Sequence, residues 1–255
     1  MAYLEIENQD GVALVKLNNG VINALNLSLL GELDQGLQHV RDDPERVALV
    51  ITSSNDKFFC IGFALPELYP LPPAEFATFF RAFNRLCLQL FTFPKPTIAA
   101  LTGHAAAGGC ILALCTDYRL AAIGIGRMGL NEIMLSVPVT RLACCILKDL
   151  LGDRRTRDAL YSGKLYTFHE AFEMGMVDEI LPPDEVVPTA VLKARELGAL
   201  SQEAFTANKH LRTHAIEAQV LAHVEEEERQ FVQQWYSAEA RQRLQAALEK
   251  FLPRK

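Results

Sequence analysis

The chain lacks several features that would place it in a large class of proteins. No apolar run approaches the roughly 18 residues of a membrane-spanning helix, so we expect no span. Its 25 lysine and arginine residues against 31 acidic ones give a net charge of −6, whereas nucleic-acid binding generally requires a basic surface. The sequence contains no G-x-S-x-G motif, no Walker loop and no metal-ligand spacing. We therefore expect no nucleic-acid partner, no membrane contact and no metal centre.

The cysteines also lack a C-x-x-C pattern, and most lie among apolar or small residues; they are Cys60, Cys87, Cys110, Cys115, Cys144 and Cys145. Such surroundings suit reduced thiols that pack as small hydrophobic side chains, which favours a reducing compartment. Residues 1–8 carry early acids and no apolar core, so we expect no signal peptide and a cytoplasmic location.

The composition and the apolar patterns indicate an α/β protein. Hydrophobic residues make up 50% of 255, enough for one large domain or a domain with an appendage. Short apolar and β-branched segments predict strands at residues 12–17, 47–52, 97–102, 118–122 and 177–181. Apolar residues at helical spacing predict helices after Asn26, over residues 76–90, 141–151, 154–161 and 167–174, and after Pro183 to about residue 200. Residues 53–73 are rich in turn formers and predict a long loop of the kind that often carries function.

Residues 97–117 are the most informative stretch. They begin as an apolar strand pattern, pass through Gly103 and the pair Gly108-Gly109, and continue as an apolar segment suited to a buried helix. Glycines at the mouth of a helix let a ligand approach the backbone, and the first helical amides have no intrahelical acceptor. Such a mouth attracts negative charge. Taken alone, however, these glycines are more typical of a turn and of close helix packing.

Five motifs lie in or around this stretch. The central one is Pro94-Lys-Pro-Thr-Ile-Ala-Ala-Leu-Thr-Gly-His-Ala-Ala-Ala-Gly-Gly-Cys. The others are Asn23-Ala-Leu-Asn, Phe58-Phe-Cys-Ile-Gly-Phe-Ala-Leu, Gly129-Leu-Asn-Glu132 and Ala171-Phe-Glu-Met-Gly-Met-Val-Asp-Glu-Ile. In this order they resemble the enoyl-CoA hydratase/isomerase (crotonase) family over most of the chain. The resemblance implies an α/β fold of the ClpP/crotonase type, a spiral of strand-strand-helix turns.

The resemblance also divides the chain into a spiral core at residues 1–200 and a C-terminal helical region at residues 201–255. Apolar stripes in the second region include Phe231, Trp235 and Phe251 on otherwise charged helices. These stripes need a partner surface, which is either the chain's own core or, as the resemblance implies, the neighbouring subunits of a homotrimer or hexamer. We expect the homo-oligomer.

Thioester chemistry beside a carbonyl requires hydrogen-bond donors for an oxygen that gains negative charge, and a base for the adjacent carbon acid. By resemblance, the donors of this oxyanion hole are the backbone amides of Phe63 and Gly108, and the base is Glu132. Hydratases of the family carry a further glutamate in the buried helix, where this chain has Ile111. The aspartate that usually follows the Phe63 position is replaced by Ala64.

A single carboxylate is what an isomerase needs to carry a proton from C2 to C4 of a 3-enoyl-CoA. We therefore expect Δ3,Δ2-enoyl-CoA isomerase activity, a step of fatty acid β-oxidation. An apolar pocket around Ile133, Met134 and Ile111 would raise the pKa of Glu132 toward the operating pH. The alternatives are another activity on a coenzyme A thioester, as in a hydratase, hydrolase or decarboxylase, and a non-catalytic acyl-CoA binder.

The resemblance places the coenzyme A ester at Ala24, Ile61, Gly62 and Lys209, although the position of Lys209 fits a solvated helix lysine equally well. Coenzyme A enters as part of the substrate, and we expect no separate cofactor.

Other features favour structural roles. The phenylalanine stripe at 76, 79, 80 and 83 is more typical of a core than of an acyl pocket. Residues 124–129 match the dinucleotide fingerprint G-x-G-x-x-G, but only eight residues separate them from the next proline, which favours coincidence. We expect His104 to be a hydrogen-bonded loop residue and Asp117 to accept hydrogen bonds from backbone donors.

Overall fold

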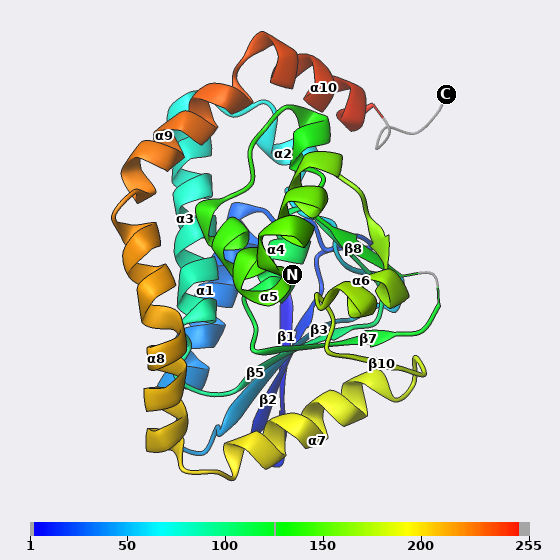
Figure 1. Ribbon diagram of the computed structural model, residues 1–255, viewed down its shortest axis with the longest axis vertical. Helices are drawn as coiled ribbons and strands as arrows, with labels where there is room; N and C mark the ends of the chain where they lie inside the picture. Colours follow the sequence, from blue (N-terminus) through cyan, green and yellow to red (C-terminus); the bar gives the residue numbers. More distant parts are fainter. Residues whose placement is uncertain (1–2, 125, 250–255) are drawn as a thin grey trace.

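The computed structural model describes residues 3–124 and 126–249, and its strands form two sheets (Figure 1). The larger sheet has the order β1 (Leu4–Gln9), β2 (Val12–Leu17), β3 (Ala48–Ser53), β5 (Thr97–Leu101), β7 (Tyr118–Ala122) and β10 (Glu179–Leu181). The smaller sheet has the order β4 (Phe58–Cys60), β6 (His104–Ala106), β8 (Arg127–Gly129) and β9 (Tyr166–Thr167). β1 pairs with β2, and β8 with β9, in the antiparallel sense; the other pairs are parallel.

From β3 to β8, consecutive strands alternate between the two sheets. β3 in the larger sheet is followed by β4 in the smaller one and then by α3 (Pro73–Phe91). The same order recurs in β5, β6 and α4 (Gly108–Leu114), and again in β7, β8 and α5 (Arg141–Ser162). The predicted α/β spiral of strand-strand-helix turns is confirmed.

The remaining helices are α1 (Leu27–Asp42), α2 (Leu65–Leu68), α6 (Phe168–Met174), α7 (Val186–Gly198), α8 (Gln202–Leu221), α9 (Val224–Trp235) and α10 (Ala238–Leu248), with a 3-10 turn η1 (Glu132–Leu135). Helices cover both faces of the larger sheet, with α7 on one side and α1 and α3 on the other (Figure 1). Val50 of β3 packs in the core that contains Ala190 of α7, whereas Leu49 and Ile51 belong to the main core. Successive side chains of a strand point to opposite faces, so both kinds of position must be apolar.

Several of the predicted helices begin with a side-chain cap. The Asn26 side chain accepts from the Leu29 amide at 2.9 Å at the start of α1, and Thr167 forms a capping box with Glu170 at the start of α6. One prediction was wrong, because residues 53–73 contain β4 and α2 instead of one irregular loop. The predicted break between helices at residues 141–151 and 154–161 is confirmed, since Gly152 (φ 71°, ψ 167°) interrupts the helical backbone of α5.

The C-terminal helices pack on their own chain. Figure 1 shows α9 running beside α3, with α10 crossing one end of the molecule, and α8 packs against α5. The ring of Phe231 stacks on that of Phe80 with centroids 3.9 Å apart, and Trp235 stacks on Phe76 at 4.2 Å. These residues therefore cover the chain's own core, while Leu211 of α8 is 68% exposed. The division at residue 200 and the homo-oligomer stay predictions.

The dinucleotide fingerprint at residues 124–129 is a coincidence, because its last three residues form β8 and lead into the short turn η1 instead of a long helix. Ile125 of that match and Phe251 of the tail stripe lie outside the described residues. No helix within residues 3–124 and 126–249 is both long and apolar enough to cross a membrane.

Candidate active site

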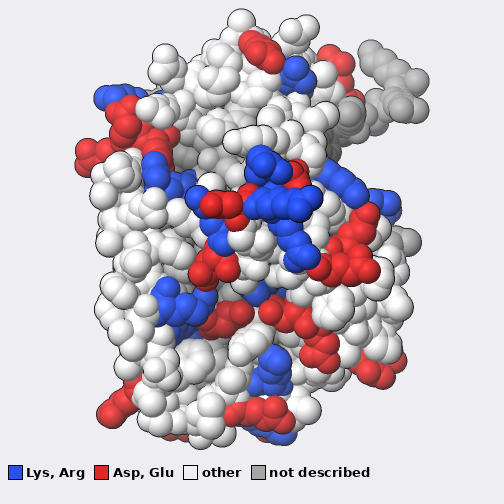
Figure 2. All heavy atoms as spheres, viewed as in Figure 1, with Lys and Arg blue, Asp and Glu red and all other residues white. Residues whose placement is uncertain are grey.

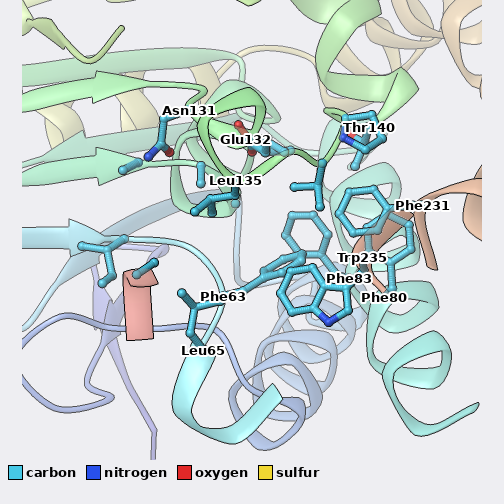
Figure 3. A pocket seen from close by; sticks show the side chains of 18 residues that line it. Phe63, Leu65, Phe80, Phe83, Asn131, Glu132, Leu135, Thr140, Phe231 and Trp235 are labelled. Carbon is cyan, nitrogen blue, oxygen red and sulfur yellow. The ribbon is translucent and has the colours of Figure 1, made fainter. Parts of the chain in front are cut away.

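A cavity of about 280 Å³ lies where three strands of the smaller sheet end (Figure 3). Its walls come from the segments that follow β4, β6 and β8, and from α3, α9 and α10. Most of the lining side chains are apolar, and the aromatic ones are Phe63, Phe80, Phe83, Phe231 and Trp235. Because β4, β6 and β8 are parallel neighbours, their carboxyl ends meet at one edge and bring three distant parts of the sequence together.

The two predicted oxyanion donors lie next to each other in this cavity. The Leu25 amide donates to Gly62 O at 2.7 Å, and the Ala64 amide donates to Leu25 O at 2.9 Å, so Leu25 pairs with both neighbours of Phe63. In such a parallel bridge the amide of Phe63, the middle residue, points away from Leu25. A Cβ on Gly62 would lie 3.0 Å from Gly108 N, so the two segments touch. Within the described residues, neither the Phe63 nor the Gly108 amide donates to another group, and both residues line the cavity.

The chain enters α4 through a strained residue. Ala107 has φ 49° and ψ −125°, a conformation that normally requires glycine and costs roughly 1–3 kcal/mol. Its amide donates to Gly129 O at 3.0 Å. Gly108 follows as the first residue of α4, where its amide has no intrahelical acceptor. Strain at this point is consistent with a backbone held for function.

Glu132 is the only ionisable side chain among the described residues that line the cavity. It begins η1, is 7% exposed, and its Oε2 has no hydrogen-bond partner in the described chain. Burial raises the pKa of Glu132 from an ordinary value of 4.5 to about 7, because the charged carboxylate loses its solvation there. A carboxyl group with this pKa gives and takes protons readily near neutral pH.

The apolar surroundings of Glu132 differ in part from the prediction. Ile111 of α4 lines the cavity as expected. The expectation for Ile133 and Met134 was wrong, since these side chains are 46% and 56% exposed and do not line the cavity. In a 3-10 turn residues i and i+3 share a face, so Leu135 lines the cavity with Glu132 while the two residues between them point away.

The start of α2 is hydrogen-bonded even though Ala64 has no polar side chain to cap it. The amides of Glu67 and Leu68 both donate to Ala64 O at 2.9 Å, and Pro66 has no amide to satisfy. The aspartate that is usual at this position is therefore not needed to cap the helix in this chain.

The residues predicted to bind the ester are not all at the cavity. Ile61 lines it, and Gly62 abuts Gly108. Ala24 is buried outside the lining, and its carbonyl accepts from Asn19 Nδ2 at 2.6 Å. Contacts of these three residues with coenzyme A stay predictions.

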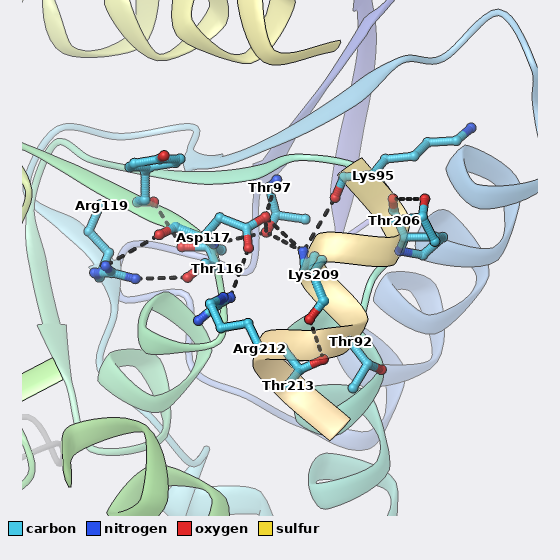
Figure 4. Close-up of polar contacts among 12 residues, drawn as sticks. Thr92, Lys95, Thr97, Thr116, Asp117, Arg119, Thr206, Lys209, Arg212 and Thr213 are labelled. Carbon is cyan, nitrogen blue, oxygen red and sulfur yellow. Dashed lines mark hydrogen bonds and ion pairs between the residues drawn. The ribbon is translucent and has the colours of Figure 1, made fainter. Parts of the chain in front are cut away.

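Lys209 lies instead in a buried polar network (Figure 4). Its Nζ is 2.7 Å from Asp117 Oδ2, 3.4 Å from Lys95 O and 3.5 Å from Thr97 Oγ1, so each of its three donors has an acceptor. Asp117 also pairs with Arg212 at 3.0 Å and accepts from the Thr97 amide at 2.9 Å, which confirms its predicted structural role. This network joins α8 to β5, and it argues against a contact between Lys209 and coenzyme A phosphates.

His104 was expected in a loop, but it lies in β6, with its ring centroid 5.4 Å from that of Phe58. The strand is only three residues long, too short to show an alternating pattern in the sequence.

Sequence reasoning missed the aromatic wall that α9 contributes. Phe231 and Trp235 were assigned only to the tail stripes, because no local motif links them to Glu132. The phenylalanine stripe of α3 serves both of its possible roles: Phe76 packs in the core, and Phe80 lines the cavity.

The fold and the site together define an α/β spiral protein whose apolar cavity presents two free backbone amides and one buried carboxyl group. The sequence profile of enoyl-CoA hydratase/isomerase matches residues 7–254. The chain belongs to this family, and its fold is the crotonase fold.

Several relatives carry more specific names. Enoyl-CoA delta isomerase 1, mitochondrial, from Mus musculus is 34% identical over 184 residues, which are 72% of this chain and 64% of the mouse protein. The Homo sapiens protein of that name is 29% identical over 245 residues, 96% of this chain and 80% of the human one. A crotonyl-CoA hydratase from Syntrophomonas wolfei is 32% identical over 191 residues, 74% of this chain and 73% of that protein.

The crystal structure of human mitochondrial delta3-delta2-enoyl-CoA isomerase superimposes with a TM-score of 0.95 at 28% identity and covers 98% of both chains. The match to the mouse relative, in contrast, spans slightly less than two thirds of that protein's length. Because the mouse and human relatives are named as mitochondrial, the expected cytoplasmic location of this chain stays a prediction.

Proposed function

We propose that the chain is a Δ3,Δ2-enoyl-CoA isomerase, which moves the double bond of a 3-enoyl-CoA ester to position 2. One observation carries the proposal: the described residues that line the cavity combine the free amides of Phe63 and Gly108 with a single ionisable side chain, Glu132. The isomerases among the relatives support it.

In the proposed reaction the ionised Glu132 removes a proton from C2 of the ester. The electrons of the broken C–H bond move toward the thioester oxygen, which becomes the oxyanion of a dienolate. The amides of Phe63 and Gly108 donate to this oxygen, and because they are fixed before the reaction they need no reorganisation. Protonated Glu132 then returns the proton to C4, the electrons flow back, and the double bond forms between C2 and C3.

The pKa of Glu132, about 7, suits this cycle. A carboxylate with an ordinary pKa would be a weak base toward carbon, and a much stronger base would not release the proton at C4. Since Glu132 Oε2 has no hydrogen-bond partner among residues 3–124 and 126–249, this carboxylate oxygen is available for the transfer.

A hydratase is the principal alternative, and one relative is named as a crotonyl-CoA hydratase. Addition of water in this family, as the sequence resemblance implies, uses two glutamates that hold and activate the water. By this resemblance Ile111 occupies the position of the first glutamate, in the buried helix, and cannot accept a proton; only the second position is filled, by Glu132. The aromatic and aliphatic lining also offers water few polar partners, which disfavours an ordered water beside C3.

The proposal is tested by incubating the purified protein with a panel of 2-enoyl-CoA and 3-enoyl-CoA esters. We expect conversion of the 3-enoyl esters to 2-enoyl esters and only slow formation of 3-hydroxyacyl esters. Rapid hydration would favour the hydratase, release of free coenzyme A a hydrolase, and loss of carbon dioxide from malonyl-type esters a decarboxylase. Tight binding without any turnover would favour the non-catalytic binder.

A further inference from the structure

The loop that carries the Phe63 amide is joined to an earlier segment of the chain, residues 22–25. Leu25 bonds to the residues on both sides of Phe63, and the Ile61 amide donates to Ile22 O at 3.2 Å. The direction of the Phe63 amide therefore depends on where this earlier segment lies.

Asn23, in the middle of that segment, is fully buried and has φ 46°. Asparagine tolerates this left-handed conformation better than most residues. Its Nδ2 donates to Ser53 Oγ at 2.8 Å, to Phe58 O at 3.3 Å and to Phe59 O at 3.2 Å. Its Oδ1 accepts from the Asn19 amide at 2.8 Å. One side chain thus joins the earlier segment to the end of β3 and to β4.

The two pieces that Asn23 connects are those that hold Phe63. β4 runs directly into Ile61 and Gly62, and Leu25 flanks the same loop from the other side. An oxyanion donor acts only when it lies about 2.7–3.1 Å from the position of the charged oxygen, so a small shift of this loop should reduce the rate.

We propose that Asn23 is a positioning residue for the oxyanion hole. Its side chain sets the spacing between residues 22–25 and β4, and through Leu25 it fixes the direction of the Phe63 amide. Asn23 does not line the cavity, so it acts without touching the substrate. This inference rests on the proposed isomerase function.

The test begins with Asn23→Gly, which removes all four hydrogen bonds and keeps a residue that adopts positive φ without strain. Loss of a whole oxyanion donor lowers kcat by about 10²–10³, so displacement of one should lower it by at least about tenfold. KM should change by less than about threefold, since the cavity walls are intact. The thioester carbonyl stretch of a bound saturated acyl-CoA, labelled with ¹³C at C1, should move toward its value for the free ester.

A milder variant and a matched control accompany it. Ser53→Ala removes one acceptor of Asn23 and should change kcat and the carbonyl stretch in the same direction by a smaller amount. Thr213→Ala removes a buried hydrogen bond to Lys209 O of 2.9 Å, away from the cavity. It should lower the unfolding temperature and leave both readouts unchanged. If Asn23→Gly does not fold, Ser53→Ala provides the test.

The positioning role is refuted if the carbonyl stretch of the folded variant is unchanged, or if kcat falls equally in the Thr213→Ala control. Failure of the isomerase proposal looks different. The wild type would then not isomerise 3-enoyl esters, yet the carbonyl stretch of its bound ester would still respond to Asn23→Gly if the positioning role is correct.

Discussion

Replacing Glu132 with glutamine should make the folded chain more stable at alkaline pH, while it removes the proposed catalytic base. The pKa of Glu132 is about 7 in the folded chain and near 4.5 when the group is solvated, so the folded state holds the proton more tightly than the unfolded state. Below pH 4.5 both states are protonated, and the contribution of the neutral carboxyl is complete. It is lost as the pH rises through 7, where the folded chain must bury a charge.

The size of the effect follows from the difference between these two pKa values. It corresponds to roughly 3 kcal/mol of unfolding free energy between acid and alkaline pH, to order of magnitude. Glutamine is neutral throughout and has no such loss. For a domain of this size roughly 3 kcal/mol corresponds to about 6–12 °C in Tm.

Urea unfolding at several pH values between 4.5 and 8, on the wild type and on Glu132→Gln, measures the effect. The wild type should lose roughly 3 kcal/mol more than the variant across this interval. Glu45→Gln, which makes the same exchange at an exposed turn position away from the cavity, is the matched control. Parallel curves for the wild type and Glu132→Gln would refute the argument that Glu132 is buried without a compensating partner.

Three other variants or measurements test separate parts of the structure. Gly108→Pro removes the amide and should lower turnover more than about tenfold beyond any loss of affinity, whereas Gly108→Ala, which keeps the amide, should lower it less; equal effects would place the donor elsewhere. Lys209→Met should destabilise the fold by roughly 3 kcal/mol, because Asp117 loses a buried partner, and leave the KM for coenzyme A esters unchanged. A higher KM for Lys209→Met would instead support the predicted contact between Lys209 and the coenzyme A phosphates. Sedimentation at micromolar concentration should show a trimer or hexamer, and a compact monomer would contradict that assignment.

The larger sheet apart from β1, and the long helices, were predictable from the sequence because burial imposes a pattern on them. β1 (Leu4–Gln9) was not predicted, since most of its residues are exposed and show no such pattern. The first four residues of β3, Ala48–Ile51, are buried and all apolar, and α1 shows both its apolar stripe and its Asn26 cap. The smaller sheet was not predictable from pattern, since β4, β6 and β8 are each three residues long. Only the family resemblance pointed to it.

The site was predictable where backbone and motif define it, and not where the tertiary structure does. The positions of Phe63, Gly108 and Glu132 at one cavity follow from motifs at the ends of parallel strands. The wall formed by Trp235 comes from a distant helix with no local signal. Spacing alone also could not reveal that the Lys209 ammonium is buried beside Asp117, because that depends on how α8 packs.

The most direct test of the central claim is double-bond migration by the wild type and by Glu132→Gln, followed in deuterated water by exchange at C2 and C4. If Glu132 carries both proton transfers, the variant should bind coenzyme A esters nearly as well as the wild type but should neither isomerise 3-enoyl esters nor exchange these hydrogens. The wild type should hydrate 2-enoyl esters only slowly. Isomerisation that survives in Glu132→Gln would contradict the account and show that another group is the base.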